Sequence, residues 1–350
     1  MKNIKRILII MLVLVVAMIS PIMGTEVLTE ERITTDGSTH YCPDVYGDIV
    51  VWYDNRAGGG DWNIYGKNLK TGENLNIYTG TGNQEEPSIY GDIVVWQDYR
   101  NLNYDIYGKN LTTGENLTIY VGPYAQRNPA IYGDIVVWFD GRNGDWDIYG
   151  KNLKTGENLT IYEGPYDQQY PAIYGDIVVW GDNRNGNWDI YGKNLKTGEN
   201  LTICEAPQSQ TYLDVYGDIV VWQDYRNSNW DIYGKNLKTG ENLTIYVGPG
   251  GQQEPSIYGD IVVWHDYRNS EWDIYGINLK TGQELTICNK TNSQYYPAIY
   301  CSRVVWSDYR NGSNYDIYLA NLDVVCIPTT QHKSLPIAQI MKILGLGQKE

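Results

Sequence analysis

The sequence has few of the residues that build metal sites and disulfide frameworks. Its three histidines are isolated from one another and have no ligand-like spacing, so we expect no bound metal. Its five cysteines are odd in number and irregular in spacing, which excludes a disulfide framework. Cys301 and Cys326 remain a candidate disulfide pair near the end of the chain.

Positive charge and the common catalytic motifs are also scarce. The formal net charge is -15, and no cluster of lysine and arginine follows the first six residues. Nucleic acids and anionic membrane surfaces need concentrated positive charge, so neither is expected as a partner, whereas neutral and cationic ligands remain. The chain has no GxSxG motif, no phosphate-binding glycine loop and no EF-hand loop, and we expect no cofactor.

A single long apolar run is present, at the amino terminus. Basic residues precede the run at 7–19, and Pro21 and Gly24 follow it, which is the order of a secretory signal. We therefore expect residues 1–24 to be a signal peptide and the protein to be exported to the cell surface or the extracellular space. Extension of the run to Met23 would permit an uncleaved membrane anchor, so release and anchoring both stay open.

The rest of the chain repeats one unit seven times. A period near 42 residues with strand-like segments is typical of propeller blades. In one copy, segments 171–175, 176–180, 187–195 and 200–204 each predict a strand, with the tight turn "KTGE" before the last. The sequence thus predicts an all-β, seven-bladed propeller of four-stranded antiparallel blades over residues 25–323. The motif "YGDIVVW", or "YCSRVVW" in the last copy, begins at Tyr46, Tyr90, Tyr132, Tyr174, Tyr216, Tyr258 and Tyr300.

The two ends of the array are incomplete in complementary ways. The last unit stops after its third strand, near Leu322, while the residues before the first unit align on a fourth strand and place Ile33 opposite Ile119. We therefore expect the N-terminal strand to complete the seventh blade and close the ring. Residues 324–350 form a C-terminal tail, whose apolar spacing indicates a short helix.

The repeat unit resembles a known propeller family. "PAIYGDIVVWGDNRNGNWDIYGKNLKTGENLTI" is similar to the TolB-type propeller repeat in its Pro-led first strand, its acid-x-Arg turn and its "DIY" strand, and is more similar still to tandem propeller repeats of archaeal cell-surface proteins. "YGD" stands where "SPDG" is usual, and the α/β domain of TolB is absent, so TolB's envelope-complex role does not carry over. The resemblance implies an exported surface propeller with a binding function.

An aspartate and an arginine recur after the second strand of every unit. Seven identical copies would form seven identical active sites, so we interpret them as structural, with bonds to the hairpin backbone and a partly exposed ion pair. A two-carboxylate glycosidase site elsewhere stays open, because separation in space is not visible in a sequence. The pairs are Asp54/Arg56, Asp98/Arg100, Asp140/Arg142, Asp182/Arg184, Asp224/Arg226, Asp266/Arg268 and Asp308/Arg310.

The copies differ most in the loops that join one unit to the next and at the residue after each second-strand tryptophan. In an up-and-down blade these positions share one end of the strands, so one face of the disc is variable. Tyrosine offers both stacking and hydrogen bonding, which suits a sugar or a protein partner. Eight of the 32 tyrosines lie outside the recurring positions, in or beside these loops: Tyr41, Tyr53, Tyr124, Tyr166, Tyr170, Tyr212, Tyr295 and Tyr296.

Two further sets of polar residues recur. A glutamine precedes the first strand in six units, with His40 in the seventh, and it either ties down the loop or contacts a ligand; the candidates for contact are Gln126, Gln168 and Gln252. Four glycosylation sequons share one position at the start of the outermost strand, where Asn-Leu-Thr either carries a glycan or simply suits the strand edge. These begin at Asn116, Asn158, Asn200 and Asn242.

The function expected from these features is binding without catalysis. We expect a surface-exposed binding or adhesion module that recognises extracellular polysaccharide or a surface protein through its tyrosine-rich variable face. Two alternatives stay open: an enzyme that degrades surface polysaccharide with acids of the same face, and an envelope structural component. No catalytic residue is assigned.

Overall fold

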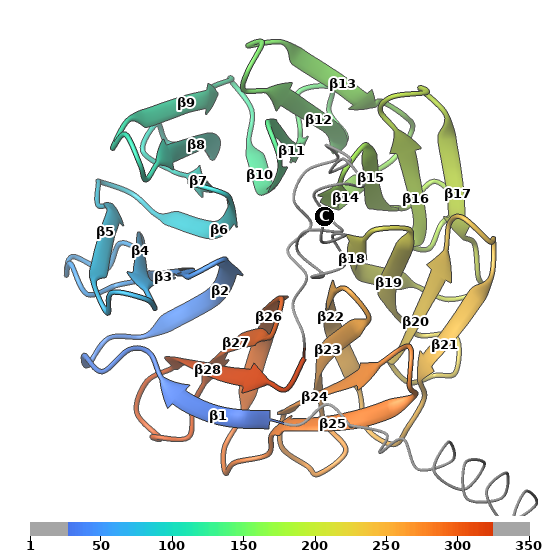
Figure 1. Cartoon of the computed structure of the whole chain (residues 1–350). Helices are drawn as coiled ribbons and strands as arrows, with labels where there is room; N and C mark the ends of the chain where they lie inside the picture. Colours follow the sequence, from blue (N-terminus) through green and yellow to red (C-terminus); the bar gives the residue numbers. More distant parts are fainter. Residues whose placement is uncertain (1–26, 325–350) are drawn as a thin grey trace, which may run out of the picture.

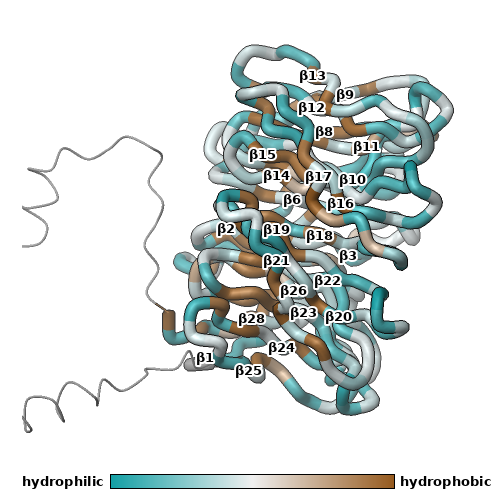
Figure 2. Tube along the Cα trace, turned by 90° about the vertical axis from the view of Figure 1, so that its right-hand side faces the viewer, coloured by the Kyte–Doolittle hydropathy of each residue, from teal (hydrophilic) through white to brown (hydrophobic). Residues whose placement is uncertain are grey.

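Seven antiparallel sheets of four strands each, the blades, are arranged in a ring (Figure 1), as the computed structural model shows for residues 27–324. Figure 2 views the ring from its edge and shows hydrophobic stretches along the strands and hydrophilic stretches in the loops. Residues 27–324 contain no helix, and hence none that could cross a membrane. The expected all-β, seven-bladed propeller is confirmed.

Six blades use consecutive strands, numbered from the innermost strand to the rim. Blade 1 is β2 (His40–Tyr46), β3 (Ile49–Asp54), β4 (Asn63–Asn68) and β5 (Asn74–Tyr78); blade 2 is β6 (Gln84–Tyr90), β7 (Ile93–Asp98), β8 (Asp105–Asn110) and β9 (Asn116–Tyr120); blade 3 is β10 (Gln126–Tyr132), β11 (Ile135–Asp140), β12 (Asp147–Asn152) and β13 (Asn158–Tyr162). Blade 4 is β14 (Gln168–Tyr174), β15 (Ile177–Asp182), β16 (Asp189–Asn194) and β17 (Asn200–Cys204); blade 5 is β18 (Gln210–Tyr216), β19 (Ile219–Asp224), β20 (Asp231–Asn236) and β21 (Asn242–Tyr246); blade 6 is β22 (Gln252–Tyr258), β23 (Ile261–Asp266), β24 (Asp273–Asn278) and β25 (Gln283–Cys288).

Blade 7 joins the two ends of the chain, as the sequence predicts. It consists of β26 (Gln294–Tyr300), β27 (Arg303–Asp308), β28 (Asp316–Leu322) and the N-terminal β1 (Val27–Arg32), which pairs antiparallel with β28. Arg32 forms an ion pair with Asp316 at 2.8 Å, and Glu30 of β1 binds Arg310. Ring closure therefore depends on side chains as well as on the strand ladder.

The hydrophobic core lies between the blades. The second strand of each blade is apolar on both of its sides because each side packs against a neighbouring blade. Trp138 of blade 3 is fully buried and packs with Val95 and Ile119 of blade 2. A blade alone would leave both sides of this strand in water, so the packing requires two neighbours, and the closed ring supplies them.

The recurring aspartate and arginine are structural, as expected. In blade 6, the buried Asp266 accepts hydrogen bonds from the indole of Trp264 and from the backbone N–H of Arg268, both at 2.9 Å. The Arg268 guanidinium pairs with this carboxylate and lies over the rings of Tyr246 and Tyr275 at 4.4 and 3.9 Å. The same two hydrogen bonds occur in all seven blades. These groups hold the hairpin and link it to the core.

Several sequence-based expectations concern residues that the structure does not describe. The signal peptide at 1–24 and the helix in the tail lie outside residues 27–324. Cys301 is disulfide-bonded, but Cys326 lies outside the described residues, so their pairing stays a prediction. Cys42, Cys204 and Cys288 are free thiols. The four sequon asparagines are all exposed at the starts of β9, β13, β17 and β21, and their glycosylation also stays a prediction.

Candidate functional site

Seven equivalent residues converge on the ring axis at the variable face. Each lies in the first strand of its blade, at a register shift, and has a left-handed backbone with φ between 45° and 55°. Such a backbone is unfavourable for residues other than glycine, and a bulge of this kind redirects a side chain. We call this set the mouth ring: Cys42, Glu86, Asn128, Tyr170, Tyr212, Glu254 and Tyr296.

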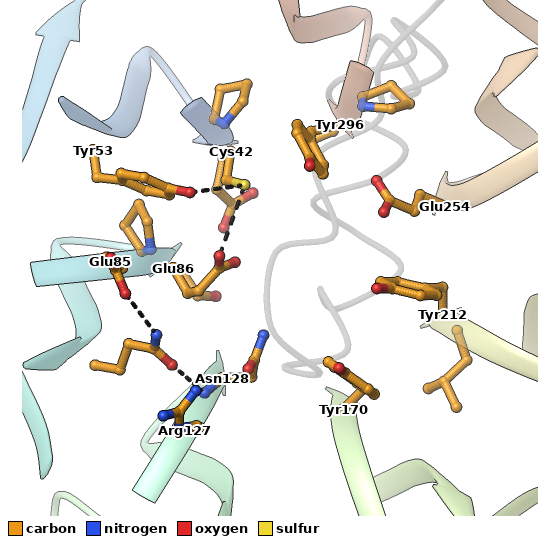
Figure 3. Close-up of a pocket in the computed structure, with 18 of the residues that line it drawn as sticks. Cys42, Tyr53, Glu85, Glu86, Arg127, Asn128, Tyr170, Tyr212, Glu254 and Tyr296 are labelled. Atoms are coloured by element: carbon orange, nitrogen blue, oxygen red, sulfur yellow. Dashed lines mark hydrogen bonds between the residues drawn. The ribbon is translucent and has the colours of Figure 1, made fainter. Parts of the chain in front are cut away.

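The mouth ring lines a funnel of about 610 Å³ that opens at the variable face (Figure 3). One wall is aromatic: the rings of Tyr170 and Tyr212 stack with centroids 5.2 Å apart, and Tyr296 lies beyond Glu254 on the same side. The opposite wall carries Cys42 and Glu86. The funnel thus offers flat ring faces on one side and polar groups on the other.

The bulges are held in place by side chains from neighbouring blades. Gln97, which follows the second-strand tryptophan of blade 2, accepts a hydrogen bond at 3.0 Å from the backbone N–H of Asn128 in blade 3. Gln223 of blade 5 binds the backbone N–H of Glu254 in the same way at 2.9 Å. The variable residue after the tryptophan therefore helps to position the mouth ring.

The two carboxyl groups of the mouth ring have strongly raised pKa values. Burial, together with the nearby charge of Glu85, raises the pKa of Glu86 to about 7. Burial and the charge of Glu86 raise the pKa of Glu254 to about 8. His265 lies 3.6 Å from Glu254, but burial lowers the pKa of this imidazole to about 3, so it is neutral and does not balance the carboxylate. Both glutamates therefore exchange protons near neutral pH.

A second cavity, of about 510 Å³, is lined by a ring of tyrosines at the constant face, and Asp44 lines both this cavity and the funnel. Neighbouring tyrosine centroids are 4.5 to 4.8 Å apart around the complete ring: Tyr46, Tyr90, Tyr132, Tyr174, Tyr216, Tyr258 and Tyr300. The tyrosine rings thus pack against one another around the axis at this face.

The eight irregular tyrosines all come from segments at the variable face, but they fall into separate groups. Tyr53 lines the funnel together with the three mouth-ring tyrosines. Tyr41 and Tyr295 pack against Tyr315 at 4.9 and 6.1 Å, away from the funnel. Tyr124 and Tyr166, which we call the rim tyrosines, lie on the outer loops and are 52% and 61% exposed. The structure therefore brings only half of the set to one cavity.

The glutamines proposed as ligand contacts are buried, and this corrects the candidate set. Gln126, Gln168 and Gln252 are at most 1% exposed, and each amide donates hydrogen bonds to backbone carbonyls of its own loop. A fully buried amide that holds its loop has no surface to offer a ligand. The alternative interpretation, that these residues tie down the loop, is the one the contacts support.

Sequence reasoning missed four members of the mouth ring: Cys42, Glu86, Asn128 and Glu254. All four directly precede the proline of the first strand, a position that differs from blade to blade. That variability was a usable signal. The bulge that turns these side chains toward the axis was not visible in the strand pattern.

The stability of the fold is expected to decrease with rising pH because of the two mouth-ring glutamates, Glu86 and Glu254. Their folded-state pKa values lie above 4.5, so the unfolded chain loses these protons first, and stability is lost as the pH rises from about 4.5 to about 8. The double variant Glu86→Gln/Glu254→Gln should show a smaller decrease in unfolding temperature between pH 5 and pH 8.5 than the wild type, because each unit of raised pKa corresponds to about 1.4 kcal/mol of pH-dependent stability. Thermal unfolding by circular dichroism measures this. The exposed Glu199→Gln is the control, and equal pH slopes in the double variant and the wild type would contradict the assignment.

Within residues 27–324, no group of three or more histidine, cysteine, aspartate or glutamate side chains is arranged to hold a metal ion. The funnel is lined by carboxyl groups, phenols, amides, a serine hydroxyl, a guanidinium and a thiol. These groups can stack on a ligand, accept and donate hydrogen bonds, and hold or release protons.

No protein-family model and no curated protein matches the sequence. Solved structures do match the fold. The β-propeller domain of the Trilobed protease from Pyrococcus furiosus has a TM-score of 0.68 and 13% identity, over 87% of this chain and 100% of that one. An oligogalacturonate lyase from Vibrio parahaemolyticus has a TM-score of 0.62 and 15% identity, over 85% and 98%. TolB from Acinetobacter baumannii has a TM-score of 0.53 and 14% identity, over 68% of this chain and 62% of that one, so the match spans less than two thirds of TolB. At these identities the similarity shows the fold alone: the chain is a β-propeller similar to TolB-type and other propellers.

Proposed function

We propose that this protein is an exported, non-enzymatic binding module whose ligand, an extracellular polysaccharide, enters the funnel at the variable face. The observation that carries this proposal is the mouth ring. Seven equivalent positions adopt an unfavourable backbone and direct seven side chains of mixed chemistry into one cavity. Backbone strain of this kind clusters at functional sites.

The size and lining of the funnel favour a saccharide. A volume of about 610 Å³ lies within the range of roughly 300 to 1,000 Å³ typical of small-ligand sites. Tyr170, Tyr212 and Tyr296 offer ring faces for stacking, while Glu86 and Asn128 offer hydrogen-bonding groups for hydroxyls. Because the funnel carries four acids and one arginine, neutral or positively charged sugars fit it better than acidic ones.

A second candidate function, cleavage of surface polysaccharide, has one specific observation in its favour. Glu86 and Glu254 share the funnel and have pKa values near 7 and 8, which suits a general acid at neutral pH. An oligogalacturonate lyase is among the similar folds. Release of products from purified surface polysaccharide, lost in Glu254→Gln, would favour the enzyme over the binding module.

Replacement of funnel tyrosines is expected to remove binding, whereas replacement of rim tyrosines is not. Tyr212→Ala removes one stacking surface and should weaken binding of a glycan-array hit by about tenfold, because a stacked aromatic contributes roughly 1 kcal/mol or more. Tyr124→Ala and Tyr166→Ala are matched controls, since both side chains are exposed on the same face but lie outside the funnel. Binding lost in the controls and retained in Tyr212→Ala would move the site to the rim. Capture of a surface protein instead of a glycan would change the ligand class.

A further inference from the structure

Four of the interfaces between neighbouring blades are filled by a tyrosine from the end of the outermost strand. At the interface of blades 2 and 3, the ring of Tyr120 lies 5.5 Å from that of Trp138, and the Arg142 guanidinium lies 4.6 Å from the Tyr120 centroid. The tyrosine thus lies between an indole and a guanidinium. The equivalent residues at the other three interfaces are Tyr78, Tyr162 and Tyr246.

At the interface of blades 4 and 5 this tyrosine is replaced by Cys204, and a cavity remains. The cavity has a volume of about 340 Å³ and is lined by Cys204, Trp222, Arg226 and Tyr233. The equivalent site around Tyr120 has a volume of only about 40 Å³ and is lined by the equivalent residues. The phenol ring that fills the site in blade 2 is absent here.

The guanidinium in this cavity has one free face. Arg142 contacts two rings, those of Tyr120 and Tyr149, whereas Arg226 lies over Tyr233 alone, at 4.1 Å, within the described part of the chain. The side chain of Arg226 is also the most exposed of the seven equivalent arginines, at 33%. Arg226 Nη2 also donates a hydrogen bond to the Cys204 Sγ at 3.6 Å, but a single sulfur atom is smaller than the phenol ring that it replaces.

The two remaining interfaces also lack the tyrosine, but the arginine at each of them binds an additional acidic side chain from the N-terminal segment, Glu30 or Asp36. Cys288 is fully buried, and its neighbour Arg310 binds Glu30 of β1. At the interface of blades 7 and 1, Arg56 binds Asp36 at 3.3 Å. No such partner reaches Arg226 in residues 27–324. Arg226 therefore differs from the arginines of these two interfaces in its partners.

We propose that the cavity between blades 4 and 5 is a binding site for a phenol ring, which lies where the repeat's tyrosine would lie, between Trp222 and Arg226. The four tyrosine-filled interfaces show that this geometry accepts a phenol. Smaller empty cavities, of about 150 Å³, bind aromatic molecules in proteins, and a guanidinium with a free face attracts an aromatic ring. The ring comes either from a small phenolic compound or from a tyrosine side chain of a peptide. The site is separate from the funnel and does not depend on the function proposed for it.

The test is titration of the full protein with p-cresol, followed by tryptophan fluorescence and calorimetry. We expect one saturable site per chain. Cys204→Tyr fills the cavity and should weaken binding at least about tenfold, while Cys204→Ala, which leaves the cavity open, should retain it. Tyr162→Cys should create a second site at the interface of blades 3 and 4. Thermal unfolding of each variant verifies that it is folded, and Cys204→Tyr restores the repeat's own residue.

Three results would overturn the proposal: no saturable binding of p-cresol by the wild type, equal binding by Cys204→Tyr, or binding lost in Cys204→Ala. A second titration, with N-acetyl-tyrosinamide, separates the sources of the ring. If both probes bind to the wild type and Cys204→Tyr weakens the binding of both, the site accepts the side chain of a peptide. If only p-cresol binds, the site takes small phenols.

Discussion

Deletion of strand β1, so that the chain begins at Ile33, should lower the midpoint of thermal unfolding by about 10 °C. The strand pairs five residues with β28, and each ladder hydrogen bond contributes roughly 1 kcal/mol. A loss of about 5 kcal/mol corresponds to about 10 °C for a domain of this size. Differential scanning calorimetry measures the midpoint.

The deletion also breaks two ion pairs and exposes a strand edge. Arg310 loses Glu30, and Asp316 loses Arg32, so a charged group in each pair is left with fewer partners. An unpaired edge on β28 is a template for pairing with another chain, so we expect concentration-dependent association in light scattering. The control is a chain that begins at Val27, which keeps β1 intact. An unchanged midpoint in the shorter chain would show that β1 does not close the ring.

Replacement of Asp266 by alanine is expected to destabilise the fold by about 3 to 5 kcal/mol. Its carboxylate is fully buried and holds the Trp264 indole, the Arg268 backbone and the Arg268 guanidinium. Removal of one partner from a buried charge pair leaves the other uncompensated, which is among the costlier single changes. Urea unfolding measures the free energy.

Two matched variants separate charge from hydrogen bonding at this position. Asp266→Asn keeps an acceptor oxygen and should lose less stability than the alanine variant, whereas the exposed Asp260→Ala in the same blade should change stability by no more than about 0.5 kcal/mol. If Asp266→Ala and Asp260→Ala were equally mild, the aspartate would not be a structural anchor of the blade, and its repetition would need another explanation.

Much of the scaffold could be predicted from the sequence because it is repeated. Comparison of seven copies separates residues such as Trp138 and Asp140, which every blade needs, from residues that each blade can change. The same comparison identified the variable face. It could not separate Tyr212, which lines the funnel, from Tyr166, which is exposed on an outer loop, because both are irregular tyrosines near the same loops.

The residues missed by sequence reasoning are those whose side-chain direction depends on a bulge in the strand. Glu86 and Glu254 lie in strands where a regular pleat would alternate side chains between the two sides of the sheet. A register shift with a positive φ turns them to the axis instead, and there burial and the charge of a nearby glutamate raise their pKa values. Likewise, Cys204 stands where four other blades have a tyrosine. Whether a cavity results depends on whether a side chain of the neighbouring blade fills the space.

The sequence by itself determined the number of blades, their strand order and the closure by the N-terminal strand. The period of the repeat and the incomplete unit at each end can be read from the chain alone. The tertiary structure decided which polar groups are buried, which side chains meet at the axis, and where a cavity remains between blades. These depend on contacts between neighbouring blades, such as those of Cys204 with Arg226 and of Cys42 with Glu86, and such contacts exist only once the blades have packed together.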